Sequence, residues 1–429
     1  MQMSESAPHN WSAPSAKRPI HSTVSIPGSK SATNRAFVLA ALGDSISKIH
    51  KPLLARDTEL MLQALEKLGC TITRSNEIIE ITPMKRVHQD LAIDVGLAGT
   101  VMRFVPPLAA LTAGVVHFDG DQRARNRPMK TLIDSLKALK ISVDDESSGS
   151  LPFSIVSDGN VQGGEITIDA SESSQFISAL LLAGAKFSNG LTIKHVGNKL
   201  PSLPHIEMTI DMLNQVGVKV SSIEKNSWKI EPTVIKSKDW LIEPDLSNAG
   251  PFIAAAMVTK GEVTITDWPQ NTTQAGNAWI EILTKMGAQV VLTEKGLTVS
   301  QSGDIKGIDF DLSDVGELTP VLVSIAVLAN SNSSLTGISH LRGHETDRLA
   351  ALVENIKAIG GDADETTDGL IIRPKKLHGG LWKSFDDHRM ATAGAVIGLV
   401  VEGIIVDDIK TTSKTLPDFE NMWTSLVGV

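Results

Sequence analysis

Polar and charged residues cluster at six places in this chain, each just before a helical stretch rich in alanine and other apolar residues. Three of these clusters contain arginine, at residues 30–35 (KSATNR), 99–103 (GTVMR) and 387–389 (DHR). A helix N-terminus carries a partial positive charge and unpaired N–H groups, so it attracts anions. The planar guanidinium group of arginine binds carboxylate or phosphate through two hydrogen bonds. These clusters therefore predict sites for phosphate or carboxylate groups.

The other three clusters supply hydroxyl, amide and carboxylate groups, at residues 173–175 (SSQ), 245–248 (DLSN) and 314–317 (DVGE). Carboxylates beside bound anions could serve as general acids and bases. The alternative is that Ser, Thr, Asp and Asn only cap these helices, although capping does not require the lysine and arginine beside them. If the helices of one domain run parallel, their starts face one cleft, which would suit a polyanionic substrate.

A second helical pattern ends six times along the chain, at intervals of about 70 residues, and a short β-like run follows each time. Glycine just past a helix usually adopts the left-handed conformation, because it has no Cβ to clash there. Lysine replaces glycine in the second copy, so the pattern is a tendency. The six positions are Gly69, Lys140, Gly217, Gly287, Gly360 and Gly428.

Each repeat also contains an upstream helical stretch that is apolar on nearly all sides, such as residues 34–42 (NRAFVLAAL), and this predicts a buried inner helix. The helices that end at the caps are amphipathic, as in residues 57–68, and are expected outside. Strand-like runs such as 165–169 and 262–266 separate the helices. Six such units would not close well around one core, so we expect an α/β protein of two three-unit domains, with the crossover near 240–247.

Composition limits the class of protein. The chain has 429 residues, 41% hydrophobic and 21% charged, which is ordinary for a globular protein. Its net charge of −9 argues against nucleic-acid binding. The single cysteine, Cys70, is expected to be a small buried hydrophobe and fits a reducing compartment. No apolar run reaches the roughly 18 residues of a membrane span, so we expect a cytoplasmic protein that does not enter a membrane.

Six motifs in this chain resemble those of the 5-enolpyruvylshikimate-3-phosphate synthase family, in the same order. They are residues 27–35 (PGSKSATNR), 97–103 (LAGTVMR), 173–176 (SSQF), 344–349 (HETDRL), 387–390 (DHRM) and 414–418 (KTLPD). The resemblance implies two similar domains, each of three βαβαββ units with buried inner helices (an inside-out α/β barrel), and an active site in the interdomain cleft. We expect a disordered tail at 1–17, one domain from 18–27 plus 246–429, and the other from 28–245.

The resemblance also implies a reaction. The enolpyruvyl group of phosphoenolpyruvate would pass to the 5-hydroxyl of shikimate 3-phosphate by addition and elimination, with release of phosphate. The product, 5-enolpyruvylshikimate 3-phosphate, leads to chorismate and the aromatic amino acids, and glyphosate would be an inhibitor. The residues expected to contact shikimate 3-phosphate are Lys30, Ser31, Arg35, Ser173, Ser174, Gln175, Ser202, Glu317 and His344.

The phosphoenolpyruvate site is expected from the same resemblance to be rich in cations. Its residues would be Lys30, Gly99, Arg123, Gln175, Arg348, Arg389 and Lys414. The catalytic residues would be Glu317, Glu345, Lys30 and His344. Glu317 is expected to take the hydroxyl proton and Glu345 to protonate the methylene carbon, although the division of acid and base work stays open.

Some positions depart from the family pattern or allow another interpretation. His205, His340 and His344 stand where the family often has Tyr, Asn and Lys. Because the ordinary pKa of histidine is about 6.5, His344 predicts a rate that varies with pH near neutrality. Glu345 could instead lie in the first turn of an outer helix that begins near His344, where acidic residues are favoured. Arg125 is expected to be solvated, with Arg127 as support for the site.

Two other functions were compared with this one. The sibling enolpyruvyl transferase acting on UDP-N-acetylglucosamine typically has a cysteine in the loop corresponding to 120–128, and here that loop (GDQRARNRP) has none. A non-catalytic ring or clamp would need a basic channel, and a binding-only homologue would not need the carboxylates. No metal ligand spacing and no phosphate-binding nucleotide loop is present, so we expect no metal or cofactor and, by default, a monomer.

Overall fold

The fold is described from a computed structural model, in which residues 10–85 and 90–428 are described. The chain forms two compact units. Unit 1 combines Met1–Pro27 with Pro244–Val429, and unit 2 is Gly28–Glu243. Pro27 and Pro244 thus mark the two passages of the chain between units, and Pro244 lies two residues before the position 246 expected from the sequence. Each unit has its own hydrophobic core.

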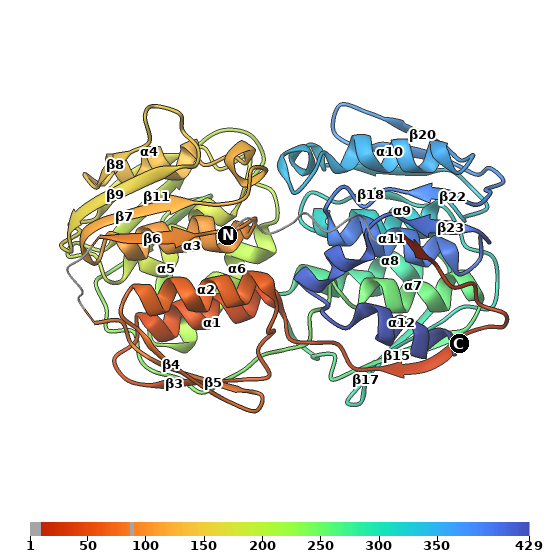
Figure 1. The fold of residues 1–429 in the computed structure, drawn as a ribbon, viewed down its shortest axis with the longest axis horizontal. Coiled ribbons are helices and arrows are strands. Elements are labelled where there is room, and N and C mark those ends of the chain that lie inside the picture. Colours follow the sequence, from red (N-terminus) through yellow and green to blue (C-terminus); the bar gives the residue numbers. More distant parts are fainter. Residues whose placement is uncertain (1–9, 86–89, 429) are drawn as a thin grey trace. The chain divides into compact units, whose positions relative to one another are not determined.

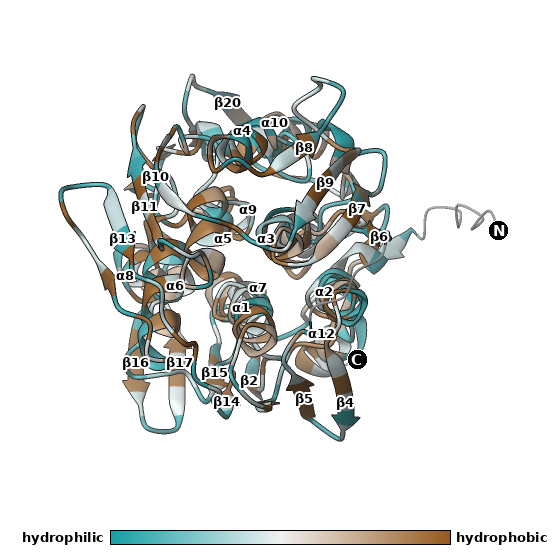
Figure 2. Cartoon of the chain, turned by 90° about the vertical axis from the view of Figure 1, so that its left-hand side faces the viewer, coloured by the Kyte–Doolittle hydropathy of each residue, from teal (hydrophilic) through white to brown (hydrophobic). Residues whose placement is uncertain are grey.

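Unit 2 contains three inner helices that pack against one another, and three outer helices (Figure 1). The inner helices are α1 (Lys30–Ala41), α3 (Gly99–Ala109) and α5 (Gln175–Gly184). The outer helices are α2 (Arg56–Lys67), α4 (Lys130–Ala138) and α6 (Leu203–Gln215). Every residue of α3 is buried, whereas α2 buries one face and exposes charged side chains on the other. Figure 2 shows the same contrast in hydropathy.

Unit 1 repeats this pattern. Its inner helices, which also pack together, are α7 (Gly250–Thr259), α9 (Thr319–Ala326) and α11 (His388–Gly398). Its outer helices are α8 (Trp279–Lys285), α10 (Arg348–Ala358) and α12 (Phe419–Val427). The buried inner helices in both units confirm the sequence expectation, because helices apolar on all sides have no face to offer to water.

Each repeat adds a small sheet outside its inner helix. In the third repeat, β10 (Gly164–Ile168) pairs in parallel with β11 (Leu191–His195), and the chain between them is α5. β13 (Ser227–Ile230) then pairs antiparallel with β11, and β12 (Val220–Ser221) lies at the edge. The second repeat has the same order with β6 (Leu91–Asp94), β7 (Ala113–Asp119), β9 (Phe153–Asp158) and β8 (Ser142–Asp144). The fifth has it with β18 (Asp309–Asp311), β19 (Ser333–Thr336), β21 (Leu370–Arg373) and β20 (Asp362–Glu365).

The two passages between units place two strands far in sequence from their partners. β14 (Trp240–Leu241) pairs in parallel with β3 (Ser47–His50), so the first repeat of unit 2 takes its first strand from the end of that unit. The rest of that sheet is the hairpin β4 (Thr71–Ser75) and β5 (Ile78–Thr82). Likewise β2 (His21–Val24) pairs with β15 (Glu262–Thr266), beside β17 (Gly296–Ser300) and β16 (Gln289–Thr293).

The sixth repeat has no strand pair after α12 among the described residues, and the N-terminal segment takes that place. β1 (Trp11–Ser12) pairs antiparallel with β23 (Ile404–Val406), which pairs in parallel with β22 (Gly380–Trp382). The expected disordered tail at 1–17 is therefore wrong for residues 10–17, because β23 has an open edge and Trp11 adds an aromatic contact with Phe419. Residues 1–9 lie outside the described part of the chain.

All six predicted caps have a positive φ, including Lys140 at 63°. The glycines among them have φ between 76° (Gly428) and 102° (Gly287). Lysine can occupy this conformation, although with more steric strain than glycine. The six-fold pattern was therefore a true structural repeat.

Candidate active site

The starts of the three inner helices of unit 2 are joined by side-chain hydrogen bonds. Asn34 Nδ2 donates to Thr100 Oγ1 across 2.8 Å, which links α1 to α3. Arg103 Nη1 donates to Gln175 Oε1 across 3.0 Å, which links α3 to α5. The three helices therefore begin at one end of the unit, as the parallel arrangement inferred from the sequence required.

Arg35 lies inside this bundle and is only 1% exposed. Its guanidinium donates to Thr209 Oγ1 (2.8 Å), to the carbonyl of His205 (2.9 Å) and to Ser178 Oγ (3.3 Å). A fourth bond reaches the carbonyl of Ser31. The arginine expected to meet substrate thus joins α1, α5 and α6 in this structure, and sequence reasoning missed its partners Ser178 and Thr209.

Gly99 is surrounded by two guanidinium groups. A Cβ built there would lie 2.9 Å from Arg103 Nη1 and 3.1 Å from Arg127 Nη2. Arg127, which is 8% exposed, donates to the carbonyl of Leu97 across 3.0 Å. Glycine at this helix start therefore lets two cations approach the backbone, and Arg127 supports the loop as expected.

Lys30 begins α1 and forms an ion pair with Asp57 of α2, with 3.4 Å between Nζ and Oδ2. Asp57 is buried, and no motif in the sequence predicts that it is a partner of Lys30. Gln175 is the first residue of α5, and its backbone N–H donates to Ser173 Oγ across 3.3 Å. Ser174 is 3% exposed, and Ser202 precedes α6 with φ of 54°.

The two neighbouring arginines of the 120–128 loop differ from one another. Arg125 is exposed and forms a two-point ion pair with Asp119, at 2.7 and 3.0 Å. Its guanidinium therefore binds a surface carboxylate of the same unit. Arg123 is also exposed, and it lies at the start of a short 3-10 turn, residues 124–126.

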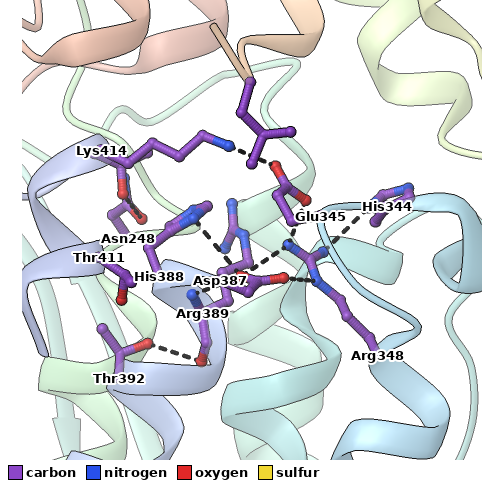
Figure 3. A network of polar contacts seen from close by, with 12 residues as sticks. Asn248, His344, Glu345, Arg348, Asp387, His388, Arg389, Thr392, Thr411 and Lys414 are labelled. Carbon is purple, nitrogen blue, oxygen red and sulfur yellow. Dashed lines mark hydrogen bonds and ion pairs between the residues drawn. The ribbon is translucent and has the colours of Figure 1, made fainter. Parts of the chain in front are cut away.

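In unit 1, Arg348 is the centre of a polar network that comes from three segments of the chain (Figure 3). Its Nε and Nη2 donate to Asp387 at 2.7 and 3.3 Å, and Nη2 also donates to Glu345 at 3.1 Å. Nη1 lies 3.2 Å from His344 Nδ1. Because arginine can only donate, His344 Nδ1 is the acceptor in this arrangement.

Glu345 lies between two cations. Lys414 Nζ donates to its Oε1 across 2.9 Å, and Arg348 donates to Oε2. Both carboxylate oxygens therefore accept hydrogen bonds, and the Glu345 side chain is only 9% exposed. The structure brings together Glu345, Arg348 and Lys414, which the sequence placed in two motifs.

Glu345 does not lie in a helical turn. The outer helix α10 begins at Arg348, and Asp347 caps it by accepting from the amide of Ala350 at 3.1 Å. The interpretation of Glu345 as part of a first turn beginning near His344 is therefore wrong. The strong cap at Asp347 starts the helix later and leaves residues 344–346 as a loop.

Asp387 connects the Arg348 network to α11. Its Oδ1 accepts the backbone N–H of Arg389 across 2.9 Å, and its side chain is fully buried. Among the described residues, the Arg389 guanidinium takes part in no hydrogen bond or ion pair. The buried carboxylate of Asp387 thus caps α11, the helix that carries the Arg389 guanidinium. The sequence places Asp387 in the cluster and motif at the start of this helix but does not predict its ion pair with Arg348.

Glu317 sits on the turn that leads into α9, and Ser247 Oγ donates to its Oε1. Ser247 belongs to the segment before α7, so the starts of α7 and α9 are in contact. His340 packs beside this turn, with its Nε2 2.8 Å from where a Cβ on Gly316 would lie. Burial, aided by the charge of Arg348, lowers the pKa of His340 to about 4, although Glu317 acts in the opposite direction.

The charges in this network hold one another in place. Burial disfavours the charge of Arg348, but Asp387 and Glu345 raise the pKa of its guanidinium above the ordinary value.

Within the described residues, no group of three His, Cys, Asp or Glu side chains is arranged to hold a metal ion. The same residues contain no helix of the length and apolarity that a membrane crossing needs.

Comparison with known proteins agrees with the motifs. A family model described as EPSP synthase (3-phosphoshikimate 1-carboxyvinyltransferase) matches residues 14–423. A 3-phosphoshikimate 1-carboxyvinyltransferase of Kocuria rhizophila is 49% identical to this chain, in an alignment that covers 97% of this chain and 96% of that protein.

Two solved structures of EPSP synthase from Acinetobacter baumannii share the fold, with TM-scores of 0.82 and 0.79. Each is 23% identical to this chain and covers 97% of it and 98% of the solved chain. They confirm the expected α/β architecture. From the family match and the 49% identity, we conclude that this chain belongs to the EPSP synthase (3-phosphoshikimate 1-carboxyvinyltransferase) family.

Proposed function

We propose that this chain transfers the enolpyruvyl group of phosphoenolpyruvate to the 5-hydroxyl of shikimate 3-phosphate and releases phosphate. Membership of the family supports the reaction. The observation that carries the proposal furthest is the network in unit 1, where Glu345 is held by Arg348 and Lys414. Cations for an anionic substrate and a carboxylate for proton transfer are what the reaction requires.

The shikimate 3-phosphate site would draw on helix starts and hydroxyl groups. The N–H groups at the start of α5 and the hydroxyls beside them suit a phosphate group. Arg35 would act from within the bundle, because its bonds to α5 and α6 fix these elements around the site. The proposed set is Lys30, Ser31, Arg35, Ser173, Ser174, Gln175, Ser202, Glu317 and His344.

The phosphoenolpyruvate site would use the cations. Arg389 has no carboxylate partner among the described residues, so its guanidinium is available for a carboxylate or phosphate. Gly99 would allow close approach to the backbone beside two guanidinium groups. The proposed set is Lys30, Gly99, Arg123, Gln175, Arg348, Arg389 and Lys414.

The chemistry would proceed in two steps. Glu317 takes the proton of the 5-hydroxyl, the oxygen forms a bond to C2 of phosphoenolpyruvate, and C3 gains a proton. C3 then loses a proton, the bond between C2 and the phosphate oxygen breaks, and the proton taken from the 5-hydroxyl leaves with the phosphate, which returns Glu317 to its carboxylate form. Both oxygens of Glu345 accept hydrogen bonds from cations, so this residue is an ionised carboxylate in the structure, which is the form that would take the C3 proton in the second step. Once protonated, Glu345 would supply the proton that C3 gains in the first step of the next reaction cycle. Lys30 and His344 are the other proposed catalytic groups.

The test is product analysis by mass spectrometry and ³¹P NMR after incubation with both substrates and no added metal. The proposal predicts phosphate and an enolpyruvyl ether of shikimate 3-phosphate only when both are present. UDP-N-acetylglucosamine in place of shikimate 3-phosphate serves as the control, and turnover of that sugar alone would identify the sibling reaction instead.

We further propose that the protein acts as a monomer in the cytoplasm. The single buried cysteine supports a reducing compartment. Light scattering during size-exclusion chromatography should give a mass near the 45.8 kDa of one chain. A mass of about twice that value would exclude the monomer.

A further inference from the structure

The side chain of Glu317 accepts a hydrogen bond from Ser247, a residue to which the proposed reaction assigns no step. We propose that Ser247 is a positioning residue, which fixes the orientation of the Glu317 carboxylate through its hydroxyl hydrogen bond. This inference rests on the proposed function, in which Glu317 accepts the hydroxyl proton. Ser247 is 5% exposed, so the donor end of its bond to the half-buried Glu317 is protected from water.

The backbone that carries Ser247 is held from a third segment, residues 274–276. Gln274 accepts the amide N–H of Leu246 at 3.1 Å and donates to the carbonyl of Pro244 at 2.9 Å. Its side-chain amide thus holds residues 244–246 from both sides. Gln274 is 7% exposed, so this clamp is also buried.

Gly276 packs directly against the same backbone. A Cβ there would lie 2.5 Å from the carbonyl carbon of Leu246 and 2.6 Å from the amide nitrogen of Ser247. A side chain at 276 must therefore push Ser247 away from its present place. On the other side, Asp245 Oδ1 accepts the amide of Asn248 at 3.0 Å. Ser247 consequently has little freedom to move.

His340 and Arg348 are among the titratable and charged groups that interact electrostatically with Glu317. Arg348 itself donates hydrogen bonds to Asp387 and Glu345. The hydrogen bond from Ser247 fixes one oxygen of the Glu317 carboxylate and stabilises its charged form.

The first test compares Ser247→Ala with Ser247→Thr. Loss of the hydroxyl should lower kcat at least about 10-fold with less than about 3-fold change in KM, and should move the acid limb of kcat upward by about one pH unit. Threonine keeps the hydroxyl and should restore most of kcat. Ser324→Ala is the matched control, because Ser324 is buried in α9 and, among the described residues, its hydroxyl donates only to the carbonyl of Val321.

The second test uses Gly276→Ala, with Gly303→Ala as its control because a Cβ on Gly303 meets nothing within 4 Å. Gly276→Ala should reproduce the kcat loss and the shifted acid limb, and the double variant with Ser247→Ala should be no worse than Ser247→Ala. Additive losses would overturn the inference, as would a Ser247→Ala variant with the parent's kcat and pH profile.

A substrate-free measurement separates this inference from the proposed function. In ¹³C-glutamate-labelled protein, with Glu317→Gln to assign the signal, Ser247→Ala should move the titration midpoint of Glu317 upward. An unchanged midpoint would overturn the positioning role even if the parent protein turned out to be inactive. A parent that releases no phosphate, with a shifted midpoint, would instead refute the proposed function alone.

Discussion

Arg348 and Asp387 form a two-point contact inside unit 1, with Nε to Oδ2 at 2.7 Å and Nη2 to Oδ1 at 3.3 Å. The two side chains are 2% and 0% exposed. The same carboxylate caps α11 through the amide of Arg389. One buried aspartate therefore orients Arg348 and fixes the helix start that carries Arg389.

Asp387→Asn should be strongly destabilising, because it leaves the buried charge of Arg348 without its main partner. Breaking such a pair removes about 3–5 kcal/mol from the free energy of unfolding. Urea-induced unfolding of the parent and the variant measures this difference in the free energy of unfolding. Asp362→Asn is the control, since Asp362 pairs with the half-exposed Arg373 and should contribute less than about 1 kcal/mol. Equal losses in the two variants would contradict the role given to Asp387.

His340 should make stability fall in acid. Its pKa is about 4 in the folded protein against 6.5 ordinarily, so below pH 6.5 the unfolded state binds a proton that the folded state does not. The free energy of unfolding should therefore drop by about 2–3 kcal/mol between pH 7 and about pH 4.5 through this group. His340→Asn should lose that part of the pH dependence. The exposed His378→Asn should keep it, and identical slopes in parent and His340→Asn would disprove the assignment.

Cys70 should be inert in the folded protein. Burial, with a contribution from Glu66, raises the pKa of its thiol to about 12. At pH 8 a disulfide reagent should react at least about 100-fold more slowly than with the chain unfolded in urea, because the thiolate is the nucleophile. Rapid labelling of the native protein would show that the thiol is exposed.

Trp11 should contribute to stability although it stands near the start of the described chain. It pairs with Val406 through β1 and contacts Phe419, with ring centroids 6.4 Å apart. Trp11→Ala should lower the free energy of unfolding by about 1–3 kcal/mol, whereas Ser12→Ala, at an exposed position, should change it by less than about 0.5 kcal/mol. Equal effects would mean that β1 is not held by its tryptophan.

The sequence was sufficient for the repeat and the inner helices, because the caps and the apolar helix bodies are local patterns. All six cap positions, Lys140 included, adopt positive φ. β1 and β14, by contrast, have two residues each, too few for any periodicity. Their positions depend on sheet edges made by residues distant in sequence, since Trp11 pairs with Val406 and Trp240 with Ile49, so only tertiary structure reveals them.

The candidate site was predictable in part for the same reason. Arg348, Glu345 and Lys414 belong to recognisable motifs, and the structure brings them into contact. The bond from Ser247 to Glu317 joins two helix starts 70 residues apart, and no local pattern encodes it. The buried bonds of Arg35 to α5 and α6 arise in the same way, from packing between repeats.

The most direct measurement compares the parent with Glu317→Gln, using phosphate release for turnover and calorimetry for binding of shikimate 3-phosphate. Glutamine keeps the size of the side chain but cannot accept the hydroxyl proton. The account predicts that release falls by at least about 100-fold while the dissociation constant changes by less than about 10-fold. Turnover close to that of the parent, or loss of binding alone, would contradict the claim that Glu317 carries the proton transfer.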